Sequence, residues 1–182
     1  MAYTYDYPRP AVTVDVVLFT LQTRRLRVLL IQRRAPPFEG CWALPGGFMD
    51  LDEELPAAAR RELREETGLR IRRLQPLGAY GRIGRDPRGR TISVVYLAFR
   101  PDAAVRARAG DDAREVGWFS PRRPPELAFD HRDILRDGLR MLRELAGEPV
   151  RFFDRFGLRD LSGDQQRDVL QAVRGRRTRI PE

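Results

Sequence analysis

The segment that restricts the fold most is residues 47–69, which read GFMDLDEELPAAARRELREETGL. Its spacing of apolar residues predicts a helix over 52–67 that begins with Asp52 as a capping residue and ends at Gly68. One stripe of this helix is apolar, with members four residues apart: Leu55, Ala59 and Leu63. A helix with a single apolar stripe must bury it against another layer of structure, so the segment indicates a layered fold.

Three glutamates share a different face of the predicted helix. At about 100° per residue, Glu62, Glu65 and Glu66 fall within an arc of roughly 100°, away from the apolar stripe. Like charges this close repel one another, and a bound cation removes the repulsion. Carboxylate oxygens are hard ligands that suit Mg²⁺ or Mn²⁺ rather than zinc. From the triplet alone two interpretations stay open: a divalent-metal site or a solvated acidic helix face.

The whole segment resembles the Nudix box, the signature of the Nudix hydrolase family, whose pattern is G-x5-E-x7-R-E-U-x-E-E-x-G-U with U an aliphatic residue. Every fixed position is matched at the required spacing, by Gly47, Glu53, Arg61, Glu62, Leu63, Glu65, Glu66, Gly68 and Leu69. With ordinary residue frequencies, a chance match at one starting point has a probability on the order of 10⁻⁹. The resemblance therefore favours the metal site over the solvated face.

Membership of this family implies a fold and a set of roles. The fold is of the α/β (α+β) class, a mixed β-sheet between helices. Glu53 and Arg61 are counted among the expected catalytic residues, with the role of orienting the loop and the carboxylates. The backbone carbonyl of Gly46 or Gly47 is expected to add a metal ligand. The expected metal ligands among the side chains, with Mg²⁺ or Mn²⁺ as cofactor, are Glu62, Glu65 and Glu66, the last two also being expected catalytic residues. The expected reaction is hydrolysis of a diphosphate linkage.

The rest of the chain supplies the other elements of such a fold. Runs rich in β-branched and other apolar residues predict strands at 11–20, 26–32, 43–47, 91–99 and 116–119. A second helix is predicted over 130–145 behind Asp130. The expected domain covers residues 1–146. Residues 147–182 form a short helical C-terminal extension in which Ser162 and Gln165 make a capping box.

Arginines supply the expected contacts to the phosphates. Residues 70–100 contain eight arginines and one acid, Asp86, an excess that suits a polyanionic ligand. A guanidinium group can bind phosphate oxygens through two parallel hydrogen bonds. The candidate substrate-binding residues are Arg33, Arg34, Arg82, Arg85 and Arg88, with Phe48 as a ring that could stack on a nucleobase. Solvated arginines on a strand face and a packed Phe48 are the alternatives.

A general base in this family often comes from a loop outside the box. The acidic loop 111–115 is the matching region, and it provides Asp112 and Glu115 as candidates for a base or an extra metal ligand. A solvated turn is the alternative. His131 is the single histidine, and its position beside a helix start indicates a structural role.

Several stretches outside the box, covering roughly residues 5–145, resemble the ADP-ribose pyrophosphatase branch of the family. A proline marks some of these enzymes about 16 residues beyond the box, where this chain has Arg85. Oxidised nucleotides and NADH therefore stay open as substrates. The same branch contains transcriptional regulators that carry a winged-helix domain, which gives the alternative function. A tail of about 36 residues is short for a winged-helix domain. The intact box also favours an enzyme over a regulator, so nucleic acid is not expected as a partner.

Composition adds a few expectations about setting. No apolar run reaches the roughly 18–20 residues of a membrane span, and the first ten residues lack the pattern of a secretory signal. One cysteine, Cys41, allows no internal disulfide, which is typical of a cytoplasmic protein. The resemblance also suggests a homodimer, with residues 1–10 reaching a neighbouring subunit.

Overall fold

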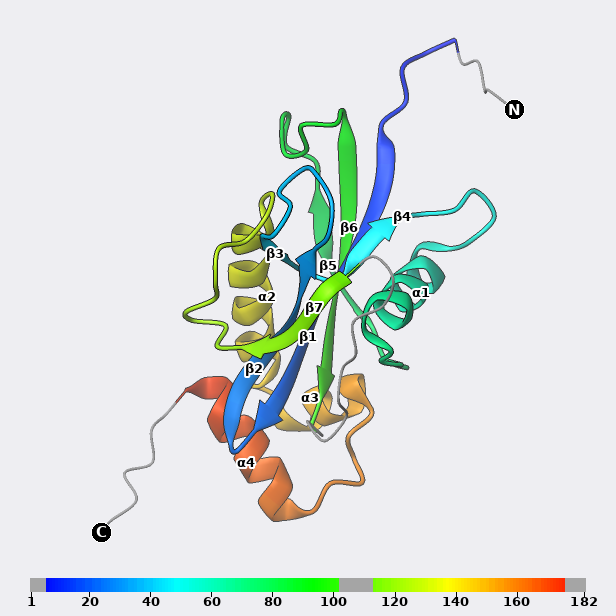
Figure 1. The fold of residues 1–182 in the computed structure, drawn as a ribbon. Helices are drawn as coiled ribbons and strands as arrows, with labels where there is room; N and C mark the ends of the chain where they lie inside the picture. The colour runs from blue at the N-terminus through cyan, green and yellow to red at the C-terminus, as the bar shows by residue number, and fades with distance from the viewer. Residues whose placement is uncertain (1–5, 102–112, 176–182) are drawn as a thin grey trace.

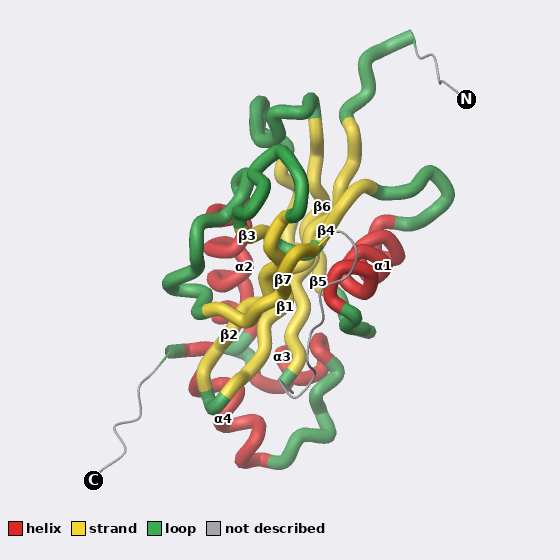
Figure 2. The backbone as a smooth tube through the Cα atoms, in the orientation of Figure 1, coloured by secondary structure: helices red, strands yellow, loops and turns green. Residues whose placement is uncertain are grey.

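Strand β1 (Ala11–Gln22) forms the centre of the sheet, as its run of β-branched residues predicts. It pairs antiparallel with β2 (Arg25–Arg33) and parallel with β6 (Thr91–Arg100), so the sheet is mixed. The structure is a computed structural model that describes residues 6–101 and 113–175 (Figures 1 and 2).

Four shorter strands complete the sheet. Strand β3 (Trp42–Ala43) and β7 (Ala113–Phe119) both pair with β2, and β5 (Gln75–Tyr80) pairs with β6. Strand β4 (Gly46–Phe48) lies antiparallel to the start of β1, with Asp15 opposite Gly46. This last pairing brings the glycine loop of the box against the central strand, and it therefore positions the candidate site.

Helices cover both faces of the sheet, since successive β1 side chains point to opposite sides. Val17 and Phe19 pack with helix α2 (His131–Leu145), whereas Val16 and Leu18 pack with helix α1 (Leu55–Thr67). Figure 1 shows α1 and α2 on opposite sides of the sheet. The predicted sheet between helices is confirmed.

Two C-terminal helices join the same core. Phe152, Phe153 and Phe156 of α3 (Pro149–Phe156) are buried, and the Phe152 and Phe156 rings contact Phe99 of β6. Helix α4 (Gly163–Arg174) adds Val169 and Val173, and it begins with the predicted capping box of Ser162 and Gln165. Residues 149–174 therefore help to form the main hydrophobic core. None of the helices in the described ranges is long and apolar enough to cross a membrane.

Several local predictions differ from the structure. Asp52 does not cap the box helix: α1 begins at Leu55 behind Glu54, since Pro56 is accommodated in a first turn, where its missing N–H is not needed. The left-handed end at Gly68 is confirmed, with φ of 71°. Strand β5 was not expected, because Pro76 and Gly78 are poor strand formers, and the pairing with β6 is irregular at these residues.

Candidate active site

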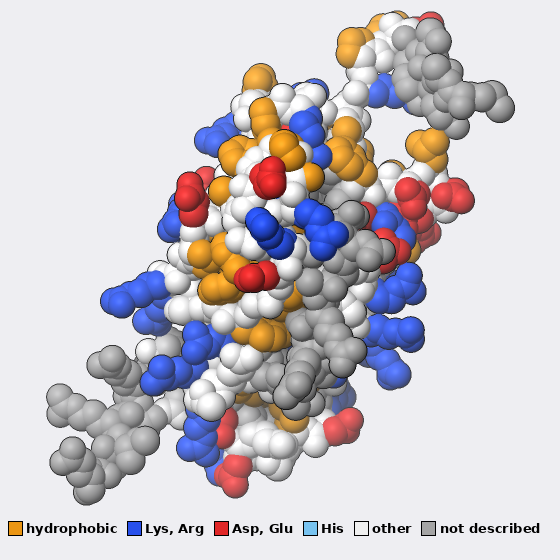
Figure 3. All heavy atoms as spheres, viewed as in Figure 1, with side chains coloured by type: hydrophobic (Ala, Val, Ile, Leu, Met, Phe, Trp, Pro, Cys, Tyr) orange, Lys and Arg blue, Asp and Glu red, His pale blue; other side chains and the backbone are white. Residues whose placement is uncertain are grey.

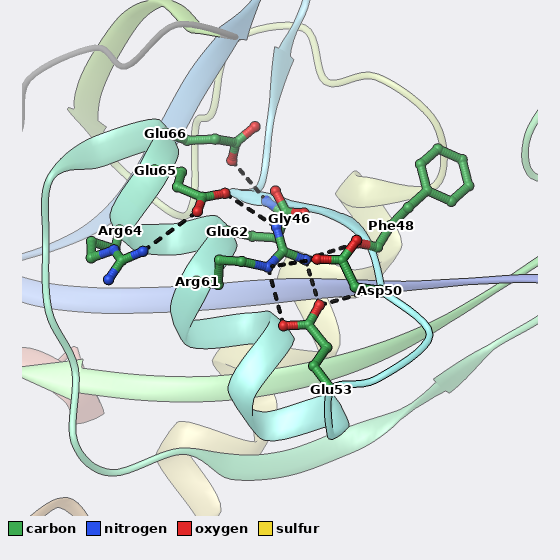
Figure 4. Close-up of polar contacts among 9 residues, drawn as sticks. All are labelled: Gly46, Phe48, Asp50, Glu53, Arg61, Glu62, Arg64, Glu65 and Glu66. Carbon is green, nitrogen blue, oxygen red and sulfur yellow. Dashed lines mark hydrogen bonds and ion pairs between the residues drawn. The ribbon is translucent and has the colours of Figure 1, made fainter.

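Arg61 lies at the centre of the acidic cluster on α1. Its guanidinium group donates hydrogen bonds to Glu53 (2.5 and 3.1 Å), to Glu62 Oε1 (2.8 Å) and to Glu65 Oε2 (3.1 Å), as Figure 4 shows. It also donates to the carbonyl of Phe48 at 3.0 Å. The hydrogen bonds with Glu53 are the largest cause of a raised Arg61 pKa, so this group stays a cation. Arg61 therefore joins the glycine loop, the start of the box and the glutamate face of the helix.

The three glutamates differ in burial and partners. Glu66 is 8% exposed, and its Oε2 accepts a hydrogen bond from the backbone N–H of Gly46 at 2.9 Å. The carboxyl of Glu62 is largely buried, and burial raises its pKa while Arg61 acts in the opposite direction. Glu65 is more exposed, with 49% of its side chain accessible. Figure 3 shows acidic side chains gathered where Figure 1 places α1 and the loop before it.

The donor chemistry of this face fits a hard divalent cation. Glu62 Oε1 and Glu65 Oε2 contact the same Arg61 nitrogen at 2.8 and 3.1 Å, so they lie within about 6 Å of each other. Among the described residues, no three acidic, histidine or cysteine side chains are already arranged as a metal-binding group. The reason is visible in the contacts: Arg61 holds Glu62 and Glu65, and the Gly46 N–H holds Glu66. Carboxylate oxygens are the ligands that Mg²⁺ and Mn²⁺ prefer, so Glu62, Glu65 and Glu66 are the side chains here that could hold such an ion.

Gly47 makes close approach to Glu62 possible. A Cβ atom at this position would lie 2.6 Å from the Glu62 carboxyl, which is closer than atoms can pack. We expect Gly47→Ala to displace the Glu62 side chain while the fold persists, because a flexible side chain end can move aside. Turnover should fall by about 10- to 100-fold, since small misplacements of reacting groups have effects of this size.

The matched control is Gly78→Ala, in which the added Cβ meets its nearest neighbour, Tyr80, at 3.9 Å. Steady-state kinetics and thermal unfolding of both variants would check the expectation. Equal turnover of Gly47→Ala and wild type would exclude a functional role for the Gly47–Glu62 contact.

A pocket opens on the other side of the glycine strand. Its wall combines two rings with two guanidinium groups: Arg88 lies 5.0 Å from the Phe48 ring and 5.7 Å from the Phe129 ring, and Arg33 lies 5.0 Å from the Phe129 ring. Phe129 has a left-handed backbone, with φ of 53°, which is unusual for a phenylalanine. This wall suits a ligand that is planar at one end and anionic at the other.

The predicted substrate arginines have different surroundings. Arg33, Arg85 and Arg88 line the pocket, whereas Arg34 and Arg82 are exposed and lie outside its lining. The Arg85 guanidinium is buried and bonded through two hydrogen bonds to Asp130, at 2.7 and 2.9 Å. The Asp130 carboxylate accepts hydrogen bonds from Arg85 and makes no capping hydrogen bond to α2, so the predicted cap of this helix is wrong.

A further ion pair supports the same loop. Arg88 contacts the buried carboxylate of Asp86 at 2.7 Å, and these hydrogen bonds lower the pKa of Asp86. Arg88 keeps 42% of its side chain accessible, so it is the more available of the two loop arginines that line the pocket.

The candidates for a general base remain predictions. Asp112 lies outside the described residues. Glu115 was expected in a loop, but it is an exposed residue within strand β7, opposite Gln32 of β2, because the pairing of β7 with β2 begins at Ala113.

Sequence reasoning missed three side chains around the site: Asp15 and Phe129 in the pocket, and Asp50 beside Arg61. Each is placed by pairing or loop geometry that local spacing does not encode. His131 also lines the pocket, where its Nδ1 accepts a hydrogen bond from the Leu44 N–H at 2.9 Å. Burial lowers the pKa of His131, which favours the neutral ring.

A mixed sheet between helices, with a carboxylate-bearing helix beside a basic pocket, fits an enzyme that hydrolyses phosphoanhydrides. Residues 9–138 match the NUDIX domain. The chain belongs to the Nudix family, and it is a Nudix pyrophosphohydrolase.

Two curated relatives are similar to the chain. The ADP-ribose pyrophosphatase of Methanocaldococcus jannaschii is 42% identical over 134 residues, which cover 74% of this chain and 76% of that protein. The ADPR-responsive transcriptional repressor of Acinetobacter baylyi is 38% identical over 141 residues, covering 75% of this chain but 56% of the repressor, just over half of its length.

Two solved structures extend the comparison beyond the Nudix domain. A MutT/nudix family protein from Enterococcus faecalis has a TM-score of 0.83 at 32% identity, covering 97% of this chain and 78% of that chain. NrtR of Shewanella oneidensis, in complex with a 27mer DNA, has a TM-score of 0.74 at 28% identity, covering 93% and 78%.

Proposed function

We propose that the chain hydrolyses the diphosphate linkage of a nucleoside diphosphate derivative, with ADP-ribose as the preferred substrate and Mg²⁺ or Mn²⁺ as cofactor. One observation carries the proposal. Gly46 and Gly47 line the pocket and also contact the box carboxylates Glu66 and Glu62. A diphosphate bound along this strand would lie between the aromatic and basic pocket and the metal-binding face.

The residues divide the chemistry between them. Glu62, Glu65 and Glu66 would hold the cation, which when bound offsets phosphate charge and lowers the pKa of a coordinated water. Arg88 and Arg33 would bind the outer phosphate oxygens from the pocket side. Arg61 would orient the carboxylates. Glu115 and Asp112 stay as proposals for the base or an extra ligand.

The choice of ADP-ribose rests on similarity and on the pocket wall. The relative from M. jannaschii is named for this substrate and matches most of the chain. The rings of Phe48 and Phe129, each near a guanidinium group, suit a purine attached to a diphosphate. NADH contains the same adenosine diphosphate unit, and oxidised nucleotides also join a base and a sugar to a phosphoanhydride, so both stay as alternative substrates.

A substrate panel tests the proposal directly. We expect hydrolysis of ADP-ribose with Mg²⁺ or Mn²⁺ to have the highest kcat/KM among ADP-ribose, NADH, nucleotide sugars, diadenosine polyphosphates and oxidised dNTPs. Chelation with EDTA should abolish turnover of every substrate, because the carboxylates alone cannot activate water. Turnover that persists in EDTA would contradict the metal assignment, and a higher kcat/KM for another compound would contradict the substrate.

A ligand-responsive transcriptional regulator is the second candidate. The similarity to DNA-bound NrtR covers 93% of this chain and so extends past the Nudix domain. Salt-dependent binding to duplex DNA that responds to ADP-ribose would favour this function. Fast hydrolysis without such binding would favour the enzyme alone.

Assembly and location also belong to the proposal. We propose a cytoplasmic location from the single cysteine of the chain, Cys41. We also propose a homodimer, because residues 6–10 are exposed and extend away from the sheet (Figure 1). A monomeric mass in solution would contradict the dimer.

A further inference from the structure

Asp15 is a buried carboxylate in the floor of the pocket. It lies on β1, is 6% exposed, and lines the pocket together with the apolar Ile31 and Leu44 and the basic Arg33, Arg85 and Arg88. Its Oδ2 accepts a short hydrogen bond from the buried hydroxyl of Ser93 on β6. Burying a carboxylate costs free energy unless hydrogen-bond donors contact its oxygens. The lone pairs of Asp15 that Ser93 does not use therefore need other donors.

The neighbouring histidine supplies only a distant donor. His131 accepts the Leu44 N–H at its Nδ1, so a neutral ring carries its proton on Nε2. That nitrogen lies 3.5 Å from Asp15 Oδ1, beyond the usual hydrogen-bond distance. Ser93 therefore makes the one close side-chain hydrogen bond to Asp15 among the described residues, and the carboxylate can accept more bonds from within the pocket.

Asp15 lies directly beside the glycine strand. A Cβ atom on Gly46 would lie 2.8 Å from Asp15 Oδ1, and the N–H of the same glycine donates to Glu66. A single backbone residue thus separates Asp15 from the metal-binding face. The part of the substrate that contacts Asp15 must therefore lie within a few atoms of the diphosphate. The nucleobase can instead stack on the rings of Phe48 and Phe129.

A donor-rich group next to a diphosphate is a sugar. Hydroxyls of a ribose can donate to a carboxylate in pairs, while phosphate oxygens cannot and are repelled by it. We propose that Asp15 is a specificity-determining residue that accepts hydrogen bonds from the vicinal hydroxyls of a ribose joined to the diphosphate. The inference rests on the proposed function, and it assigns the recognition of the sugar to a residue outside the box.

Binding without turnover tests the inference. Titration calorimetry in EDTA would compare wild type with Asp15→Asn for three ligands: ADP-ribose, ADP, and ADP-ribose with a 2′,3′-dideoxyadenosine half. We expect Asp15→Asn to weaken ADP-ribose at least about tenfold, since hydrogen bonds to charged groups are strong. The ligand that lacks the recognised hydroxyls should bind Asp15→Asn as tightly as wild type or more tightly, because a repulsive charge is gone. If ADP is the ligand that the variant binds as tightly as wild type, Asp15 recognises the terminal ribose. If the dideoxy compound is that ligand, Asp15 recognises the ribose of adenosine.

Ser93→Ala is the matched control. It removes the donor of the Asp15–Ser93 hydrogen bond but leaves the carboxylate, whereas Asp15→Asn removes the charge and keeps an oxygen that can accept from Ser93. A merely structural role for Asp15 would weaken all ligands in both variants. Thermal unfolding would show that each variant is folded. Equal weakening of all three ligands by Asp15→Asn, or no change, would overturn the inference.

Failure of the proposed hydrolase function can be distinguished from failure of the Asp15 inference. If wild type binds ADP-ribose but does not hydrolyse it with Mg²⁺ or Mn²⁺, the proposed function fails while the Asp15 inference is still decided by the binding series. If wild type hydrolyses ADP-ribose and Asp15→Asn binds it equally well, the inference fails alone. Absence of binding by wild type would overturn both.

Discussion

Replacing Glu66 with glutamine is expected to reduce turnover by orders of magnitude, which corresponds to roughly 3–5 kcal/mol of transition-state stabilisation. Glu66 is the most buried of the three box glutamates, and it lies against the glycine strand through the Gly46 N–H. A glutamine keeps an oxygen that can accept this hydrogen bond, so the fold should persist. What is lost is the negative charge needed to hold a divalent cation.

The experiment measures kcat and KM across a range of Mg²⁺ concentrations, together with thermal unfolding. Glu144→Gln, an exposed glutamate on α2, is the matched control and should behave as wild type. Near-normal activity of Glu66→Gln at low Mg²⁺ would refute the assignment of metal ligands. A large loss of folding stability would instead indicate that Glu66 is structural.

Replacing Phe152 with alanine is expected to lower the free energy of unfolding by about 3–5 kcal/mol, as for other buried phenylalanines. The Phe152 ring is fully buried, and it contacts Phe99 of the sheet at a centroid distance of 5.6 Å. A loss of this size is a large share of the stability of a typical domain. It would show that residues 147–182 include part of the domain core.

Chemical denaturation of the variant would measure the effect. Val150→Ala on the same helix is the control, because Val150 is 78% exposed and its truncation should change stability by less than about 0.5 kcal/mol. If Phe152→Ala were as stable as wild type, the C-terminal helices would be an appendage and not part of the core.

The box could be predicted from sequence because its information is local. Helical spacing alone brings Glu62, Glu65 and Glu66 to one face, and a fixed interval of eight residues brings Arg61 to Glu53. The end of the helix at Gly68 is equally local.

The pocket could not be predicted in this way. Asp15 reaches Gly46 only through the pairing of β1 with β4, and it reaches Ser93 through the parallel pairing of β1 with β6. Phe129 lies beside Arg33, almost a hundred residues earlier in the chain, and beside Arg88, about forty residues earlier. Spacing identifies a catalytic helix, but the part of a site that selects substrate depends on strand register.

The position of Arg61 among the glutamates has one more consequence. In small zinc domains the metal holds the chain together, so that chelation and unfolding are the same event. Here a permanent guanidinium cation already offsets the carboxylates and fastens the glycine loop to the helix. These contacts hold the glycine loop on the helix through side chains of the protein alone. On the proposed metal assignment, we therefore expect chelation to stop turnover without unfolding the chain.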